Sequence, residues 1–408
     1  MKIPQIRIPI VCGIILLFGG FSIGLTLSYS SPTIDALTAK FNFSSFEKNC
    51  FICISSFVGF IAAIVAAVVI KYTGKKLINI ISGFIGGMTF LILGFANAKW
   101  LVFFARALNG ATLGLYSAGC PSFLAEIAPE GKSGFYGFLN QCGICFGFLF
   151  ATVFGLFDDY QLCSYLCSIP SFIIMIGIIF VPEKKQVGGK SSKFTKLFKY
   201  KSELLIAMIT LFFLQFSGIN AILGNLQSII EKTNIKIKSK YVALIANAVQ
   251  IVATIIATFL IDFFGYTVCW VFSTIGQMIA FLLLFFHQEY DLPSGVFMLG
   301  LFLEQFTYGV GTGPIPFAFA AEIMKPSIRA AGCSLSIAVS WFFAGLVCIV
   351  WPTLQSAMKN YSYIFFGVIS LLAAIFGFFK VRKVNVDDSS SSSDQMSRRL
   401  SKRGDEAL

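Results

Sequence analysis

Four neutral amide side chains lie inside long apolar segments of this sequence, at Gln141, Gln215, Asn220 and Gln250. A primary amide offers two donors and an acceptor with two lone pairs, so it suits a ligand whose hydroxyl groups both donate and accept. Polar side chains within membrane spans mark functional positions, although any one amide can instead bond a neighbouring helix. The set predicts a binding site for a polyhydroxylated ligand.

The spacing of Gln215 and Asn220 places a condition on this site. Five residues correspond to about 500° around a regular helix, so the two side chains would point roughly 140° apart. Both can reach one ligand only if the helix breaks between them. The intervening sequence "FSGI", which contains Gly218, permits such a break.

A second break is expected in the stretch "GTGPIPFAFAAEIM", residues 311–324, which lies in an apolar run. Proline lacks an N–H and leaves a carbonyl of the preceding turn without its helical partner. In lipid that carbonyl must be satisfied by protein or by water in a cavity. Gly313, Pro314 and Pro316 are therefore predicted to form a gating bend within protein, with a static kink as the alternative.

The composition indicates that the helices carrying these groups lie in a membrane. The chain has 408 residues, of which 57% are hydrophobic and only 12% charged, whereas a soluble domain carries roughly 25% charge. About twelve segments approach the length of about 20 apolar residues that a span needs. We therefore predict an all-α membrane protein of twelve transmembrane helices, and the first apolar run is interpreted as a span and not as a cleaved signal peptide.

One long polar interruption divides these spans into two sets of six. The predicted organisation is a six-helix half over 1–181, a cytosolic linker over 182–203, a second half over 204–383, and a disordered cytosolic tail over 384–408. Most of the 31 Lys and Arg residues fall in the termini and in the loops on the same side as the termini. The positive-inside rule then places both termini in the cytosol. The net charge of +12 is thus assigned to contact with anionic lipid and not with nucleic acid.

The two halves repeat each other in sequence. Gly74 in "IKYTGKK" corresponds to Gly265 in "IDFFGYT", and Glu126 in "AEIAPEGKSG" corresponds to Glu322 in "AEIMKPSIRAAG". Matching landmarks at nearly one offset indicate a duplicated unit. Parallel repeats of this kind, related by an axis along the membrane normal, characterise one large transporter architecture.

At these positions the chain resembles the sugar-porter branch of the major facilitator superfamily, over about residues 8–380. The motifs that carry the resemblance are "RALNGATLG" (106–114), "PSFLAEIAP" (121–129), "LNQ" (139–141), "LQFSGINA" (214–221) and "GTGPIPFAFAAEI" (311–323). The first span looks most like class III glucose facilitators and insect trehalose facilitators. The resemblance implies two pseudo-symmetric halves that rock around a central sugar site.

Residue by residue, the resemblance implies that Gln141, Gln215 and Asn220 contact the sugar and that Gln250 stands where the family often has Asn. Phe317 occupies the family's Trp position in the tenth span, and Trp341 matches a Trp in the eleventh. Several polar residues of the family are replaced here. Ser340, for example, stands where an amide is usual, so a shape-tolerant or low-affinity site is expected.

The resemblance also implies a cytosolic network of acids and loop cations that closes the inner side. The matching residues here are Lys75, Lys76, Glu126, Glu322 and Arg329. Tyr266 and Thr267 replace the cation pair of the second half. A lysine is a point charge without the bidentate fork of arginine. The network is therefore expected to be weaker, particularly in the second half, with solvated surface charge as the alternative interpretation.

The driving force is predicted from the first span. Proton-coupled relatives carry an Asp where this chain has Ser22, and a hydroxyl does not titrate near neutral pH. Facilitated diffusion of a hexose or other small sugar is therefore the first hypothesis. The alternatives are a proton-coupled sugar symporter that uses Glu304, which might instead pair with Arg106, and a non-transporting sugar sensor.

The remaining predictions concern partners and modification. We expect no enzyme activity, no cofactor, no metal site and a monomeric functional unit in the plasma membrane, in contact with lipid and a small-molecule sugar. Asn42 begins the sequon "NFS" in the first outer loop, and Ser401 follows a basic pair in "RRLS". These two residues are predicted sites of glycosylation and phosphorylation.

Overall fold

The computed structural model describes residues 7–129, 133–183, 200–231, 233, 235–325 and 328–382. Most of the predicted linker, the predicted tail and Ser401 lie outside the described residues. The boundaries predicted for the two halves therefore stay predictions.

The described part of the chain contains helices and no strand. The first helices are α1 (Arg7–Ser28), α2 (Ser30–Phe41), α3 (Ser45–Phe95), α4 (Lys99–Ile127), α5 (Ser133–Gly155) and α6 (Tyr160–Gly177), followed by the 3₁₀ turn η1 (Ile178–Phe180). The later helices are α7 (Lys201–Phe216), α8 (Ile219–Gly224), α9 (Leu226–Glu231), α10 (Ser239–Glu289), α11 (Ser294–Thr307), the π-helical turn η3 (Tyr308–Thr312), α12 (Ile315–Ile323), α13 (Arg329–Met358) and α14 (Tyr361–Lys380).

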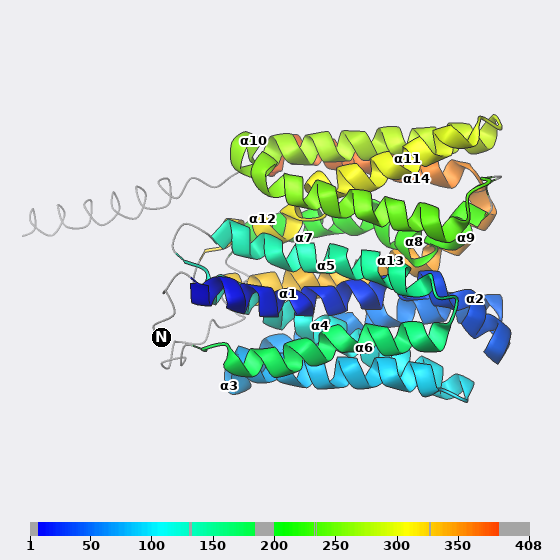
Figure 1. Cartoon of the computed structure of the whole chain (residues 1–408). Coiled ribbons are helices and arrows are strands. Elements are labelled where there is room, and N and C mark those ends of the chain that lie inside the picture. The colour runs from blue at the N-terminus through cyan, green and yellow to red at the C-terminus, as the bar shows by residue number, and fades with distance from the viewer. Residues whose placement is uncertain are drawn as a thin grey trace, which may run out of the picture.

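The helices run side by side between two faces, which Figure 1 shows at left and right. The face at left, where α1 begins and α14 ends, is called the terminal face. The opposite face, which holds the turns at 42–44 and 156–159, is called the loop face. Its turns are well capped: Ser44 and Glu47 form a reciprocal capping box at the start of α3.

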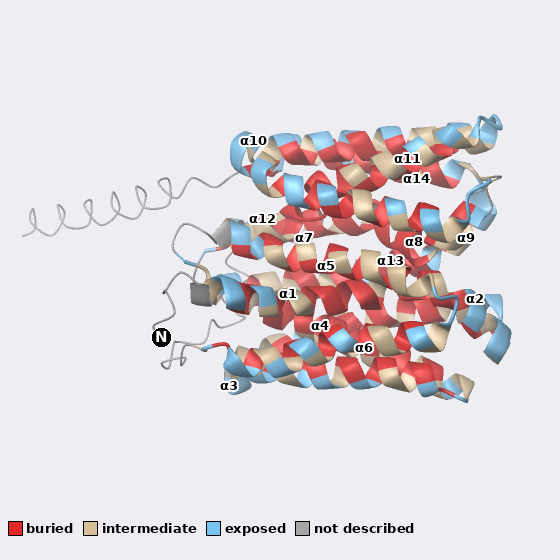
Figure 2. Ribbon diagram, viewed as in Figure 1, coloured by how far each residue is buried: buried red, intermediate tan, exposed pale blue. Residues whose placement is uncertain are grey.

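Burial follows the positions of the helices in the bundle. Buried residues line the interior, and exposed residues lie along the outer sides of α3 and α10 (Figure 2). Eight helices of the described chain are long and apolar enough to cross a membrane. Helix α4 is not among them although it has 29 residues, because Arg106 and several small or polar residues lower its mean hydropathy.

Helices α3 and α10 are each a pair of spans joined at a sharp bend on the terminal face. The bends occur at Gly74 (φ 80°, ψ 168°) and Gly265 (φ 77°, ψ 170°). This backbone region is essentially restricted to glycine, since a side chain there meets the backbone. The two glycines singled out by the sequence repeat therefore make the same turn.

The repeat extends to the hydrogen bonds beside these bends. Lys76 Nζ donates to the carbonyl of Val181, 3.2 Å away, at the end of the sixth span. The equivalent Thr267 Oγ1 donates to the carbonyl of Val381, 2.5 Å away, at the end of the last span. Each bend is thus tied to the closing turn of its own half, although the two side chains differ in type.

The two sets of helices pack through α3 against α13 and through α5 against α10. Polar contacts between them lie at the middle of the bundle and toward the loop face. Lys240 Nζ pairs with Asp158 at 2.5 Å, and Asn247 Nδ2 donates to Thr152 Oγ1 at 2.7 Å. Near them, Ser30 Oγ donates to the carbonyl of Gly224 at 3.3 Å. These contacts join the two sets of helices on the side of the loop face.

Replacing Gly265 with Ala should destabilise the protein by about 1–3 kcal/mol, the cost of a non-glycine residue in this backbone region. An added methyl group would meet nothing within 4 Å, so backbone strain alone is tested. The measurement is the thermal melting temperature in detergent. Gly137→Ala is the matched control, because that glycine is also unobstructed but lies within α5. Equal melting temperatures for Gly265→Ala and the wild type would contradict the assignment.

Candidate functional site

The predicted break between Gln215 and Asn220 is present. Helix α7 ends at Phe216, Gly218 adopts φ 84°, and α8 begins at Ile219. The turn brings the two amides together, so that Asn220 Nδ2 donates to Gln215 Oε1. Both side chains are buried. The helix break that the five-residue spacing of Gln215 and Asn220 requires is therefore present.

These amides connect α7 and α8 to α13. Gln215 Nε2 donates to Ser340 Oγ at 2.7 Å. The next residue, Trp341, donates its indole N–H to Ser117 Oγ of α4 at 3.0 Å. Ser340, which stands in place of an amide of the family, is thus the direct partner of Gln215. One polar chain runs from α8 through α7 and α13 to α4.

A second polar group joins α5 to α10. Gln141 Nε2 lies 3.8 Å from Cys145 Sγ, which lies 3.4 Å from Thr254 Oγ1 of α10. A methyl group added to Gly313 would lie 3.2 Å from Gln141 Nε2, so this amide also faces the break after α11. Gln250 lies one turn before Thr254, is fully buried, and has no hydrogen-bond partner for either polar side-chain atom.

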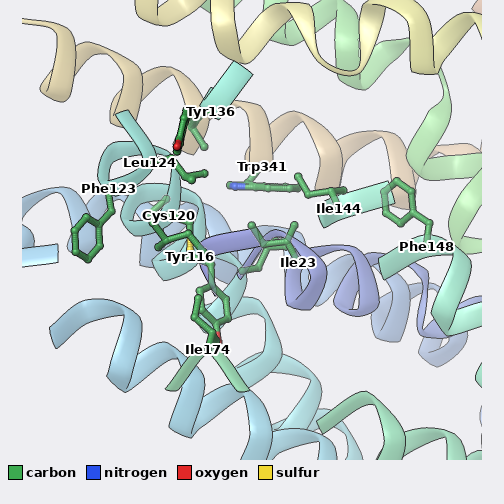
Figure 3. Packing of buried hydrophobic residues seen from close by; sticks show 14 of the residues in the cluster. Ile23, Tyr116, Cys120, Phe123, Leu124, Tyr136, Ile144, Phe148, Ile174 and Trp341 are labelled. Carbon is green, nitrogen blue, oxygen red and sulfur yellow. The ribbon is translucent and has the colours of Figure 1, made fainter. Parts of the chain in front are cut away.

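An apolar cluster lies between these two polar groups. It includes Ile144 of α5, Ile219 of α8, Tyr308 of η3 and Trp341 of α13, and Phe317 packs against it. Figure 3 shows the Trp341 indole lying among Ile23, Leu124 and Ile144. Both predicted aromatic residues therefore share one cluster with α5 and α8, which carry Gln141 and Asn220. Aromatic faces next to amides can pack on the apolar face of a sugar ring while the amides bond its hydroxyls.

The break at 308–314 makes hydrogen bonds within the protein. Residues Tyr308–Thr312 form a π-helical turn, and the Gly313 N–H donates to the carbonyl of Tyr308 at 2.9 Å. Ser273 Oγ on α10 donates to the carbonyl of Thr307 at 2.6 Å and accepts the N–H of Thr312 at 2.9 Å. A single hydroxyl thus bonds a backbone carbonyl and a backbone N–H of the π-helical turn. A bend packed in this way was one of the two environments expected.

Glycine is required for this close approach. A methyl group at Gly311 would lie 2.5 Å from Ser273 Cβ and 2.6 Å from the carbonyl of Cys269. A real side chain never lies so near, so α10 would have to move away. Gly311 therefore allows Ser273 to reach the broken backbone.

On the terminal face, the two predicted acids have different partners. Glu126 pairs with Lys75 at 2.5 Å, with both side chains about one-sixth exposed (15% and 17%). Glu322 instead accepts a hydrogen bond from the hydroxyl of Tyr266 at 2.7 Å. Because Tyr266 occupies the position equivalent to Lys75, a neutral donor replaces the cation in the second half.

Two members of the predicted network make other contacts. Arg329 does not pair with Glu322 among the described residues; its Nε donates to the carbonyl of Met324 at 3.3 Å. Lys76 bonds the carbonyl of Ile179 at 2.6 Å in addition to that of Val181. Arg329 begins α13 and bonds the turn just before it, so its part in the predicted network stays a prediction.

The pairing suggested between Glu304 and Arg106 is wrong. Arg106 Nε donates to the carbonyl of Phe51 at 3.0 Å, and its Nη1 donates to the carbonyl of Thr26 at 2.7 Å. Its guanidinium also lies over the Phe51 ring, 5.0 Å from the centroid. Backbone carbonyls of α1 and α3 therefore stabilise this buried cation. Glu304 lies in the other half, on α11, where it packs against α10.

Sequence reasoning missed Ser273 and Glu183. Glu183 accepts the backbone N–H of Lys75 at 2.6 Å and so caps the bend at Gly74. A serine within an apolar span carries no signal of such a role, because its partners are 34 and 39 residues distant in sequence. For Glu183 the only available signal was an acid directly after the sixth span.

The family model described as "Sugar (and other) transporter" matches the chain twice, over residues 11–186 and 184–386. Among curated proteins, the chain is 25% identical to the facilitated trehalose transporter of Polypedilum vanderplanki, over 91% of this chain and 84% of that protein. It is 23% identical to the sugar transporter ERD6-like 6 of Arabidopsis thaliana, over 90% and 86% of the two chains. The structure of a D-xylose-proton symporter matches with a TM-score of 0.76 and 18% identity, over 92% of this chain and 98% of that chain.

Replacing Ser273 with Ala should lower the melting temperature measurably. The change removes two buried hydrogen bonds to the backbone of the turn, each of which contributes about 0.5–1.5 kcal/mol net. Thr258→Ala on the same helix is the control, because that hydroxyl bonds only the carbonyl of Ile255 in its own helix. If the two variants have the same melting temperature, the hydrogen bonds of Ser273 do not stabilise the π-helical turn.

Proposed function

The chain belongs to the sugar-porter family of the major facilitator superfamily, whose members carry sugars across membranes and are not enzymes, and we propose that it does so by facilitated diffusion. Its fold is the two-part, twelve-span fold of that superfamily. The proposed substrate is a hexose or another small sugar. It would move down its gradient as the two halves alternately open each face.

The observation that carries this proposal is the chemistry of the first span. Helix α1 contains no carboxyl group. Ser22, at the position that would hold a coupling acid, donates to the carbonyl of Phe18 at 3.0 Å and accepts from Ser171 Oγ at 3.0 Å. Both are neutral hydrogen bonds within the bundle. A span of this kind has no carboxyl group that could bind and release a transported proton near neutral pH.

In the proposed site, Gln141, Gln215, Asn220 and Gln250 bind the sugar hydroxyls, while Phe317 and Trp341 pack on its ring. Gln141 lies on α5, which contributes Ile144 to the central cluster, and Asn220 lies on α8, which contributes Ile219 to the same cluster. Gln250 supports this assignment most directly, because a fully buried amide without a partner has bonding capacity left for a ligand.

The proposed cycle requires the contacts described above to break in turn. Lys240–Asp158 and Asn247–Thr152 would part when the loop face opens. The break at Gly313, Pro314 and Pro316 would let α12 move relative to α11. Lys75–Glu126 and Tyr266–Glu322 would hold the terminal-face ends of each half together during that movement.

Transport assays on proteoliposomes should show exchange that is equilibrative and insensitive to a protonophore. Internal free sugar should approach the external level and not exceed it. The substrates to compare are labelled glucose, xylose, a polyol and trehalose. Accumulation of any of them several-fold above the external level, abolished by the protonophore, would instead establish the second candidate, a symporter that uses the buried acid Glu304.

Gln141→Ala and Gln215→Ala should each weaken sugar affinity roughly three- to tenfold, since a lost ligand hydrogen bond costs about 0.5–1.5 kcal/mol net. Gln161→Ala is the control, because Gln161 lies at the loop face and bonds the carbonyl of Gly94. An unchanged half-saturation concentration in both site variants would remove these amides from the site.

The loop face is proposed to be extracytosolic, in a plasma membrane, with the basic terminal face in the cytosol. Asn42 is exposed on the loop face, where it ends α2 with φ 52°. When the protein is produced in eukaryotic cells, glycosidase treatment should therefore increase its gel mobility, and Asn42→Gln should remove that shift. Untreated wild type and Asn42→Gln migrating together would argue against this orientation.

A further inference from the structure

A group of polar side chains in α10 and α11 has no role in the site described above. Gln277, Glu304 and Gln305 are completely buried, with no measurable exposure. Within the part of the chain that the structure describes, none of their side-chain oxygen or nitrogen atoms has a hydrogen-bond partner that meets the usual geometry. Buried polar groups are almost always bonded, so three unpaired neighbours on two packed helices require an explanation.

Glu304 lies on a stretch of α11 that packs closely against α10. A methyl group at Gly276 would lie 2.3 Å from Thr307 Cγ2, and one at Gly300 would lie 3.1 Å from the carbonyl of Ala280. Glu304 lies between Gly300 and Thr307 along α11. Gln277 of α10 is the polar side chain beside its carboxyl, without the geometry of a hydrogen bond.

The charged surroundings of Glu304 are sparse. Helix α11 packs against α10 and η3. The titratable groups of these elements near it are Tyr308, one turn further on, and His287, which packs against Phe297 two turns earlier. Cys145 of α5 lies beyond Tyr308. None of these is a fixed cation, so a carboxylate at Glu304 would have no counter-charge, whereas the neutral acid could be accommodated.

The same face of α10 supports the break in the neighbouring helix. Ser273 lies one turn before Gln277, and it bonds both Thr307 and Thr312 across the π-helical turn. Thr307 Oγ1 also bonds the carbonyl of Glu304 at 3.2 Å. Any shift of α11 away from Gln277 would therefore strain the bonds between Ser273 and the π-helical turn.

We propose that Glu304 is a reversible proton-binding site that regulates the bend between α11 and α12, with the neutral acid allowing transport and the carboxylate slowing it. This inference rests on the proposed function, because the bend is the element that moves in the transport cycle. The proton binds and leaves the carboxyl without crossing the membrane with the sugar. Ionisation would place an uncompensated charge between α10 and α11 and disturb their packing at Ser273.

The test is sugar exchange in proteoliposomes at equal internal and external pH, from about pH 6 to about pH 9. Wild-type exchange should fall at least about fivefold over this range, the lower end of typical coupling between linked sites. Glu304→Gln, a neutral isostere, should exchange at the acid-side rate throughout. Glu289→Gln is the control, because that acid lies at the exposed end of α10 and should keep the wild-type profile.

A second measurement does not depend on transport. The wild-type melting temperature should fall with rising pH across the same range, and that of Glu304→Gln should fall much less. If Glu304→Gln keeps the wild-type dependence in both assays, the proposal is overturned. If Glu304→Gln fails to fold, the pH at which exchange falls is compared between Gln277→Leu and the wild type. The proposal predicts different pH values for the two proteins, and equal values would overturn it.

The outcomes separate this inference from the proposed function. If no sugar is exchanged, the function fails while the melting temperatures still test Glu304. If the wild type accumulates sugar and Glu304→Gln exchanges without accumulating, the proton travels with the sugar. That result would overturn both facilitated diffusion and the regulatory role.

Discussion

A helix that crosses a bilayer cannot leave a backbone N–H or C=O unpaired, because lipid supplies neither donors nor acceptors. Two departures from regular helix in the described chain have specific side-chain partners. Ser273 bonds the backbone of the π-helical turn, and Glu183 caps the bend at Gly74. The site depends on this constraint, since only interrupted helices bring Gln215 beside Asn220 and Gly313 beside Gln141.

The two halves satisfy the same geometry with different chemistry. The bends at Gly74 and Gly265 have nearly identical backbone angles, yet a lysine–glutamate pair in the first half corresponds to a tyrosine–glutamate hydrogen bond in the second. A hydrogen bond between a neutral hydroxyl and a carboxylate is less affected by salt than an ion pair. The terminal-face ends of the halves should thus respond differently to ionic strength.

Much of this arrangement could be predicted from the sequence, because it depends on local signals. Gly218 and the five-residue spacing of two amides indicated a helix break, and matching glycines and glutamates indicated the repeat. Contacts between distant segments could not be predicted: the partners of Arg106, Arg329 and Ser273 depend on which helices pack together. Opposite charge suggested Glu304 as the partner of Arg106, whereas in the packed bundle the guanidinium bonds backbone carbonyls.

Arg106 has a consequence for how the protein is made. An arginine within a span opposes insertion by up to about 3 kcal/mol. Helix α4 is also not among the eight helices that are long and apolar enough to cross a membrane. The carbonyls of Thr26 and Phe51 that bind the guanidinium belong to α1 and the first part of α3. Both segments are synthesised before α4. During biogenesis these two segments would already be in the membrane when α4 is inserted. Their carbonyls would then bind Arg106 and stabilise an α4 that is not hydrophobic enough to insert by itself.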